Sequence, residues 1–374
     1  MITVATIFGT RPDALKMAPV ITNLRRFPDQ VRLQVLVTGQ HKEMLHQVLS
    51  LFQITPDVDL QIMSERQSLA QIAARILERL DPILAEERPD LVLVQGDTST
   101  SCLASLAAFY HQIPVGHIEA GLRTDNRYDP FPEEINRRLT GVLADFHFAP
   151  TAQSAANLAR EGVPAERIYP VGNTVIDALL SVAQQPYQFT EPALAAAVAG
   201  SGPLLLVTAH RRENWGEPLH RIARAVRRLV SEFPEVRVVF QMHKNPIVRE
   251  AVQAELGGVA RVALVEPQAY LPWVQLMKRC TLILTDSGGI QEEAPALGKP
   301  VLVMRETTER PEGVAAGTAR LVGTDEEAIY GAAARLLREP EEYAAMAQAR
   351  NPYGDGQAAR RIREILFRHF GVEA

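Results

Sequence analysis

The stretch LILTDSGGIQEE, residues 282–293, shows the pattern that decides the fold. Its first four residues are typical of a buried strand, and they run through a polar turn with two glycines into a helical segment. Short apolar runs of this kind recur along the chain and alternate with longer amphipathic segments, as in parallel sheets joined by crossover helices. The expected strands are Ile2–Phe8, Leu33–Val37, Leu91–Gln95, Val115–Ile118 and Phe146–Ala149, followed by Leu204–Thr208, Val236–Gln241, Val262–Val265, Leu282–Thr285 and Val301–Met304.

The two groups of strands predict two α/β domains, each a doubly wound, Rossmann-like sheet, with both domains facing one cleft. A length of 374 residues also exceeds what one typical core needs. We expect an N-terminal domain at residues 1–172 and a C-terminal domain at 173–354. Residues 355–374 are expected to contain a last helix that can pack on either domain.

The composition favours a soluble globular protein. The net charge is -5, from 39 basic and 44 acidic residues, which argues against nucleic acid or an anionic membrane as the main partner. We find neither a membrane-spanning apolar run nor a signal peptide, and therefore expect a cytoplasmic protein. Cys102 and Cys280 lie outside any CxxC or Cys/His cluster, so we expect neither disulfides nor a metal site.

Ligands of open parallel sheets bind beyond the carboxyl ends of the strands, so polar residues directly after strands are candidate site residues. In residues 286–293, Ser287 is expected at the N-cap of a helix, and Gly288 and Gly289 occupy its first turn. Glycine is costly there, and we interpret the pair as a seat for a diphosphate on free N–H groups, with a purely structural turn as the alternative. Glu293, one turn later, suits hydrogen bonds from ribose hydroxyls, or is simply a solvated or helix-paired carboxylate.

Two cations lie where the first helix is expected to begin. Arg11 and Lys16 follow the strand Ile2–Phe8 and lie near the expected N-terminus of a helix, where the helix dipole disfavours positive charge. An anionic ligand or a carboxylate partner is therefore expected for them. No GxGxxG follows a strand and no GxxxxGK[ST] occurs, which disfavours a dinucleotide or P-loop site.

Three carboxylates are candidates for acid/base chemistry. Asp97 and Glu119 follow strands, whereas Glu133 and its neighbour Glu134 begin a helix, where complementing the helix dipole is the alternative to a catalytic role. Adjacent carboxylates in a cleft push their pKa values apart, which provides one acid and one base. The second half adds cations and imidazoles suited to a polyanion, and an aromatic residue that either stacks on a base or packs in the core. These residues are His210, Arg211, Arg212, His243 and Trp273.

Eight motifs stand in the order found in one enzyme family. They are FGTRPDALKMAP (8–19), TGQHKEML (38–45), QGDTSTS (95–101), HIEAGLRT (117–124), FPEEINRR (131–138), TAHRREN (208–214), TDSGGIQEEAP (285–295) and MRETTERPEG (304–313). Over nearly its whole length the sequence resembles the non-hydrolysing UDP-N-acetylglucosamine 2-epimerases. The resemblance implies a GT-B-like fold, a homodimer, and interconversion of UDP-GlcNAc and UDP-ManNAc for surface polysaccharide synthesis.

The resemblance also implies roles for individual residues. It places acid/base catalysis on Asp97, Glu119 and Glu133, with His210 beside them. UDP binding falls to Arg11, Lys16, His210, Trp273, Ser287, Gly288, Gly289, Glu293 and Arg310. A second UDP-GlcNAc, acting as an allosteric activator, would meet Gln40, His41, Arg66, Arg211 and His243. Asp13 replaces the Glu that is more common in the first motif.

The chemistry implied by the resemblance agrees with these residues. C2 of an N-acetylhexosamine is not adjacent to a carbonyl, so its proton is not acidic enough for simple abstraction. Elimination of UDP to 2-acetamidoglucal, followed by re-addition, avoids this difficulty and needs neither a cofactor nor a metal. The alternatives are a GT-B glycosyltransferase, a hydrolysing epimerase and a non-enzymatic nucleotide-sugar sensor.

Overall fold

The computed structural model describes residues 1–39, 42–64 and 67–373, with the backbone alone for 42–44. The chain divides into two compact units. Unit 1 comprises Met1–Ala178 together with Tyr353–Ala374, and unit 2 comprises Leu179–Pro352. In the part of the chain that is described, no helix is long and apolar enough to cross a membrane.

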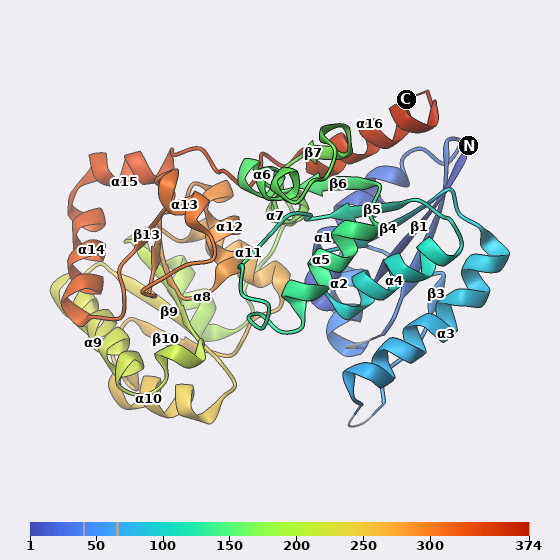
Figure 1. Ribbon diagram of the computed structural model, residues 1–374. Helices are drawn as coiled ribbons and strands as arrows, with labels where there is room; N and C mark the ends of the chain where they lie inside the picture. The colour runs from blue at the N-terminus through green and yellow to red at the C-terminus, as the bar shows by residue number, and fades with distance from the viewer. Residues whose placement is uncertain (40–41, 65–66, 374) are drawn as a thin grey trace. The chain divides into compact units, whose positions relative to one another are not determined.

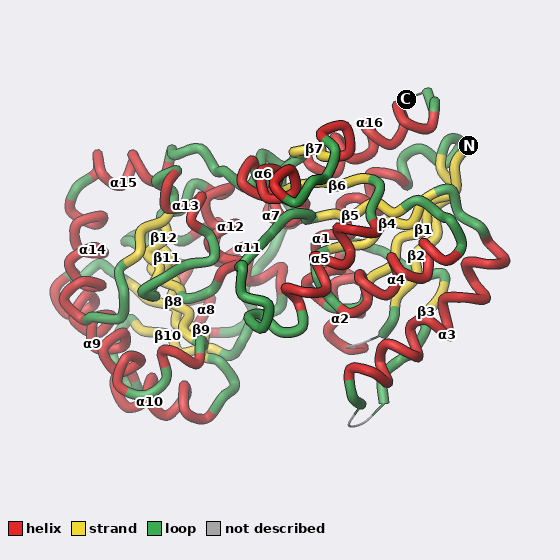
Figure 2. Tube along the Cα trace, viewed as in Figure 1, coloured by secondary structure: helices red, strands yellow, loops and turns green. Residues whose placement is uncertain are grey.

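Unit 1 is built on a parallel sheet with the strand order β3-β2-β1-β4-β5-β6-β7 (Figures 1 and 2). The strands are β1 (Ile2–Phe8), β2 (Val31–Val37), β3 (Val58–Asp59), β4 (Leu91–Gln95), β5 (Val115–Ile118), β6 (Phe146–Ala149) and β7 (Ile168–Pro170). The helices are α1 (Arg11–Leu24), α2 (Lys42–Leu51), α3 (Leu69–Glu87), α4 (Ser99–Tyr110), α5 (Glu133–Leu143), α6 (Ala152–Arg160) and α16 (Ala358–Phe370). A further helix, α7 (Thr174–Ala183), begins in unit 1 and ends in unit 2.

Helices cover both faces of this sheet, because alternate strand residues point to opposite faces and nearly all of them are apolar. On one face Val4 and Phe8 pack with residues of α1, α2 and α16. On the other face Ala5 and Ile7 pack with residues of α3 and α4.

The C-terminal helix α16 belongs to unit 1, a point that the sequence left open. Gln357, at its N-cap, makes no side-chain capping bond. Asp177 of α7 takes over this function, since its carboxylate accepts the N–H groups of Ala358 and Ala359 at 3.2 and 2.9 Å. Burial raises the pKa of Asp177 to about 6.

Unit 2 repeats the pattern with a parallel sheet of order β10-β9-β8-β11-β12-β13. Its strands are β8 (Leu204–Ala209), β9 (Arg237–Met242), β10 (Val262–Val265), β11 (Leu282–Thr285), β12 (Val301–Val303) and β13 (Ala319–Leu321). Its helices are α8 (Pro192–Ala199), α9 (Glu217–Glu232), α10 (Pro246–Leu256), α11 (Tyr270–Arg279), α12 (Gly288–Glu293), α13 (Pro311–Ala315), α14 (Glu326–Arg338) and α15 (Pro340–Ala347). The main core lies between the sheet and the helices α9, α10 and α14.

Each sheet has one topological switch point. The chain builds outward from β1 in one direction and then from β4 in the other, and it does the same from β8 and β11 in unit 2. At such a point the loops after two neighbouring strands diverge to opposite faces and leave room for a ligand. The loops beginning at Gly9 and Gly96 meet this condition in unit 1, and those beginning at His210 and Asp286 meet it in unit 2.

The expected α/β class with two doubly wound sheets is confirmed, and all ten expected strands are present, with bounds that shift by at most a few residues. The edge strands β3, β7 and β13 were missed. They are only two or three residues long, too short to show a hydrophobic period.

Candidate active site

Glu119 lies at the carboxyl end of β5 with its backbone in the left-handed region, at φ 63°. This conformation is costly for a residue with a Cβ, and such strain concentrates at functional sites. The residue is only 8% exposed, and donors surround its carboxylate. The Nε2 of Gln95 donates to Oε2 at 2.6 Å, the Nδ2 of Asn173 donates to Oε1 at 3.1 Å, and Lys16 forms an ion pair with Oε1.

The turn that carries Asp97 is fixed on two sides. Arg137 of α5 forms an ion pair with the Asp97 carboxylate, and Asn136 donates from Nδ2 to the Asp97 carbonyl oxygen at 3.0 Å. His117 of β5 fixes the residue before it, because its Nε2 lies 2.7 Å from the carbonyl oxygen of Gly96, which can only accept. Burial lowers the pKa of His117 to about 3, so this imidazole is neutral.

Asp97 and Glu119 are neighbours. A Cβ built on Gly96 would lie 3.4 Å from Oε2 of Glu119, so the Glu119 carboxylate rests against the turn that carries Asp97. The pairing of two carboxylates at strand ends is therefore present within unit 1.

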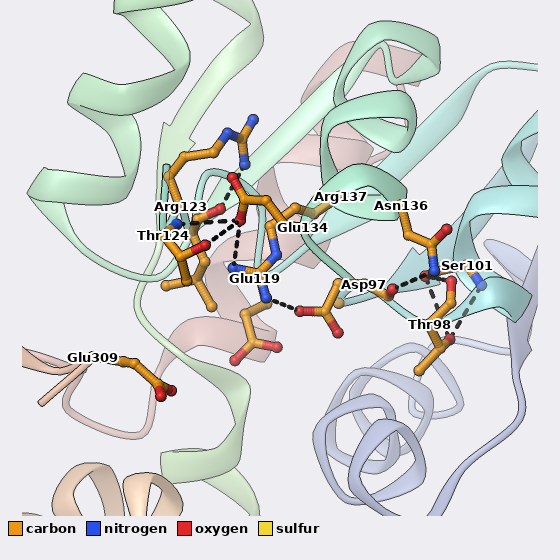
Figure 3. A network of polar contacts seen from close by, with 12 residues as sticks. Asp97, Thr98, Ser101, Glu119, Arg123, Thr124, Glu134, Asn136, Arg137 and Glu309 are labelled. Carbon is orange, nitrogen blue, oxygen red and sulfur yellow. Dashed lines mark hydrogen bonds and ion pairs between the residues drawn. The ribbon is translucent and has the colours of Figure 1, made fainter. Parts of the chain in front are cut away.

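Glu133 and Glu134 differ sharply in their surroundings. Glu134 is fully buried and accepts the backbone N–H of Thr124 at 3.1 Å, and Arg137 and Arg138 also contact its carboxylate. Figure 3 shows Arg137 between the carboxylates of Asp97 and Glu134. Glu134 thus anchors the loop before α5. Glu133 is half-buried in the first turn of α5, and its acid/base role stays a prediction.

The sequence analysis attached no role to Asp13, yet it is a buried junction. Its Oδ2 accepts the N–H groups of Gly9 and Thr10 at 3.4 and 3.2 Å and the hydroxyl of Thr98 at 3.3 Å. It therefore links the loop after β1 to the loop after β4. Burial raises the pKa of Asp13 to about 7, against the opposing effect of its hydrogen bonds to Thr10.

In unit 2 the buried carboxylate of Asp286 organises the loop after β8. Its Oδ2 accepts the backbone N–H groups of His210 and Arg211 at 2.8 and 2.9 Å and the Nδ2 of Asn214 at 3.0 Å. The other oxygen, Oδ1, lies 3.0 Å from Nδ1 of His210. This arrangement leaves the Nε2 side of His210 for a ligand, and hydrogen bonds and the charge of His210 hold the pKa of Asp286 below its usual range despite burial.

Neither the backbone conformation nor the packing of the protein requires glycine at the two positions after Ser287. Neither has a positive φ, a Cβ at Gly288 would meet only Arg211 at 3.8 Å, and a Cβ at Gly289 would meet nothing within 4 Å. Ser287 occupies the N-cap as expected, but its side chain makes no capping bond. This combination leaves the first turn of α12 open to a group from outside the chain.

Beyond that turn, the expected UDP contacts are partly engaged with protein groups. The hydroxyl of Tyr270 donates to Oε1 of Glu293 at 2.5 Å, and Arg310 forms an ion pair with the adjacent Glu292. Trp273 is only 7% exposed on α11, so most of its ring packs against the protein. Arg11 begins α1 and is half-buried.

Two of the residues expected to bind the activator adjoin the same end of unit 2. The ring of His243 stacks on His210, with centroids 5.9 Å apart and planes at 22°. Arg211 lies beside Gly288. Gln40, His41 and Arg66 lie outside the described residues.

The residues that support the candidate catalytic carboxylates and Asp286 were not predicted from the sequence. Asn173, Gln95 and His117 contact Glu119 or the turn of Asp97, and Asn214 contacts Asp286. Of these, Gln95, His117 and Asn214 stand inside the quoted motifs, and for Gln95 and His117 a polar residue on a buried strand was the available signal.

Comparisons with known proteins agree on one family. The family model described as UDP-N-acetylglucosamine 2-epimerase matches residues 23–367. The UDP-N-acetylglucosamine 2-epimerase of Bacillus subtilis (strain 168) is 54% identical over 368 residues, which cover 98% of this chain and 96% of that protein. A solved structure from Listeria monocytogenes has a TM-score of 0.94 at 49% identity and covers 99% of this chain and 97% of its own.

Two further structures bear on ligand and fold. The UDP-GlcNAc 2-epimerase from Neisseria meningitidis, solved bound to UDP-GlcNAc, has a TM-score of 0.85 at 49% identity and covers 98% of this chain and 100% of its own. The glycotransferase of kitacinnamycin, at 14% identity and a TM-score of 0.66 with 98% of each chain covered, shares the fold alone. The expected GT-B-like class is thereby confirmed.

We predict that Asp13→Asn gains stability relative to the wild type as the pH rises. Between the pKa of an unfolded aspartate and about 7, the folded chain keeps a proton on Asp13 that the unfolded chain has lost, so rising pH destabilises the wild type. Asparagine keeps an accepting oxygen without a buried charge. The relative gain between pH 5 and pH 8 should be on the order of a few kcal/mol at most, measured by unfolding at both pH values.

The matched control for this prediction is Asp29→Asn, at an exposed position of the same unit. It should show no change with pH relative to the wild type. Parallel pH profiles for the wild type and Asp13→Asn would contradict the buried, protonated Asp13.

Proposed function

Because the chain belongs to the UDP-N-acetylglucosamine 2-epimerase family, we propose that it interconverts UDP-GlcNAc and UDP-ManNAc by inverting C2 of the sugar. The observation that carries the proposal is Glu119, strained at the end of β5 and held by donors beside the turn of Asp97. A carboxylate held in one orientation beside a second one is what proton transfer at carbon requires. The epimer would serve surface polysaccharide synthesis.

The proposed reaction is elimination followed by re-addition. A carboxylate takes the C2 proton while the bond from C1 to the phosphate oxygen breaks, and UDP leaves with the electron pair. The product is 2-acetamidoglucal, with a double bond between C1 and C2. UDP then adds back at C1 while an acid protonates C2 on the opposite face.

Asp97, Glu119 and Glu133 share the proton transfers in this proposal. Arg137 and Lys16 stabilise the ionised forms of Asp97 and Glu119, respectively, through direct ion pairs. His210, oriented by Asp286, is suited to donate to the departing diphosphate.

UDP is proposed to bind mainly to unit 2. The first turn of α12 has room above Ser287, Gly288 and Gly289 for close approach of phosphate oxygens. Glu293 is assigned to the ribose and Trp273 to the uracil. Arg11, Lys16 and Arg310 complete the cationic surroundings.

A second UDP-GlcNAc is proposed to act as an activator near Arg211 and His243. Both residues adjoin groups assigned to the UDP site, since His243 stacks on His210 and Arg211 lies beside Gly288. Filling one site would thus alter the groups that line the other, which is the requirement for coupling.

A homodimer is proposed as well. Phe109 and Tyr110 at the end of α4 and Leu139 and Val142 on α5 are 49 to 84% exposed. Three of the four, Phe109, Tyr110 and Val142, also line one surface pocket of about 600 Å³. Exposed apolar patches of this kind mark contacts between proteins, and a second copy of the chain is the proposed occupant.

Epimerisation in deuterated water is predicted to place deuterium at C2 of the product. Asp97→Asn, Glu119→Gln and Glu133→Gln should each lower turnover by about a hundredfold or more where the residue carries a proton. NMR of the products of UDP-GlcNAc measures both effects. Glu87→Gln, which removes an exposed ion pair with Arg32, serves as the control and should keep full turnover.

Other products would redirect the assignment. Free ManNAc indicates a hydrolysing enzyme, transfer to an added acceptor indicates a glycosyltransferase, and binding without turnover indicates a sensor. Retention of the original C2 hydrogen would falsify the elimination route.

Gly288→Val is predicted to weaken UDP binding by about tenfold or more, because its side chain occupies the space of charge-assisted contacts to phosphate. Calorimetry measures the affinity. Gly331→Val on α14 is the matched control, since a Cβ at Gly331 also meets nothing within 4 Å. Equal UDP affinity in both variants would contradict the proposed diphosphate site at the first turn of α12.

The reverse reaction is predicted to depend on the activator. UDP-ManNAc alone should be converted slowly or with a lag, and a small amount of UDP-GlcNAc should abolish the lag. UDP-glucose at the same concentration controls for ionic effects. Immediate conversion of UDP-ManNAc at full rate would contradict activation.

A further inference from the structure

Asn173 lies where the two crossings of the chain between the units come together within unit 1. The chain leaves unit 1 after Ala178 and returns to it at Tyr353. The backbone N–H of Asn173 donates to the carbonyl oxygen of Tyr353 at 2.7 Å. Backbones are also close beside it, since a Cβ at Gly172 would lie 3.3 Å from the Cα of Gly354.

Both ends of the Asn173 amide are engaged. Its Oδ1 accepts the N–H of Val175 at 3.1 Å, and its Nδ2 donates to Oε1 of Glu119 at 3.1 Å. The side chain is deeply buried, with the residue 2% exposed. One planar group therefore joins the start of α7 to the carboxylate at the end of β5.

The contact of Asn173 with Glu119 differs from the contact of Lys16. The ammonium of Lys16 pairs with Oε1 by charge and sits on a flexible stem, so it constrains direction weakly. The amide of Asn173 is planar and already fixed by Val175, so it constrains where Oε1 points. An oriented carboxylate is what selects one face of a sugar carbon for proton transfer.

We propose that Asn173 is a positioning residue for Glu119. Through Asn173, the orientation of the reactive carboxylate depends on the segments where the chain leaves unit 1 and returns to it. The inference rests on the proposed function of Glu119 in proton transfer. Asn173 touches neither substrate nor the reacting atoms in this scheme and acts only through Glu119.

The competing explanation is that Asn173 serves only as a turn former through its bond to Val175. Aspartate performs that function as well as asparagine, because it needs only an accepting oxygen. Asn173→Asp keeps this oxygen but replaces the donor to Glu119 with a second carboxyl group, and adjacent carboxyl groups shift each other's pKa. A loss of kcat in Asn173→Asp therefore supports positioning only if Asn173→Ala, which adds no charge, loses kcat as well.

The experiment compares the wild type, Asn173→Asp and Asn173→Ala in UDP-GlcNAc epimerisation, with the thermal midpoint and UDP affinity of each chain. Positioning predicts that both variants lose about ten- to a hundredfold in kcat, while the KM for UDP-GlcNAc and the affinity for UDP change less than about threefold. Asn126→Asp is the matched control, because Oδ1 of Asn126 also accepts an N–H two residues on, at 3.1 Å, but at an exposed position. It should keep the wild-type kcat.

Wild-type kcat in Asn173→Asp would overturn the proposal and leave Asn173 as a turn former. If Asn173→Asp does not fold, Asn173→Ala decides by the same comparison of kcat with KM. Failure of both variants to fold would assign Asn173 to stability and overturn positioning too. A wild type that does not epimerise UDP-GlcNAc would instead refute the proposed function, so the two failures are distinct.

Discussion

The carboxylate of Glu119, taken out of water at the end of a strand, must be met by donors from several distant segments of its unit. A buried charge is tolerated only when donors meet it. Here those donors come from α1, β4 and the segment before α7, which are distant in sequence. The hydrogen bonds to Glu119 fix the ends of β4 and β5 and the start of α7 relative to each other. The turn that carries Asp97 packs against the Glu119 carboxylate.

Asp286 plays the same part in unit 2 with a different outcome. The groups that meet it all belong to the loop after β8, and they are the backbone N–H groups of His210 and Arg211 and the side chains of Asn214 and His210, so Asp286 shapes that loop. In one unit the buried carboxylate is the proposed reactive group, and in the other it orients an imidazole. In the proposed function, the same topology thus carries acid/base groups in one half and anion-binding groups in the other.

The repeated strands and the loops after them could be predicted from the sequence, because apolar runs and the polar residues that end them are local signals. The supporting residues could not. Asn173 and Glu119 are separated by 54 positions and meet only through the topology of the sheet. Asp13 stood out in the sequence only as a substitution. Its contact with Thr98 could not be predicted, because the capping box with Thr10 already accounts for an aspartate at this position. The different surroundings of Glu133 and Glu134 could not be predicted either, because two adjacent residues at a helix start do not reveal which one is buried.

The position of α16 has a consequence for how the chain folds as it is synthesised. Residues 179–352 are inserted between Ala178, inside α7, and the last segment of unit 1, so unit 2 is complete before α16 has been made. Until then the apolar surface formed by Leu24, Phe146 and Phe148, which Ile362 and Phe367 later cover, stays exposed on the nascent unit 1. The first domain to be translated is therefore the last to close its core, and its exposed face during that interval is a natural target for chaperones.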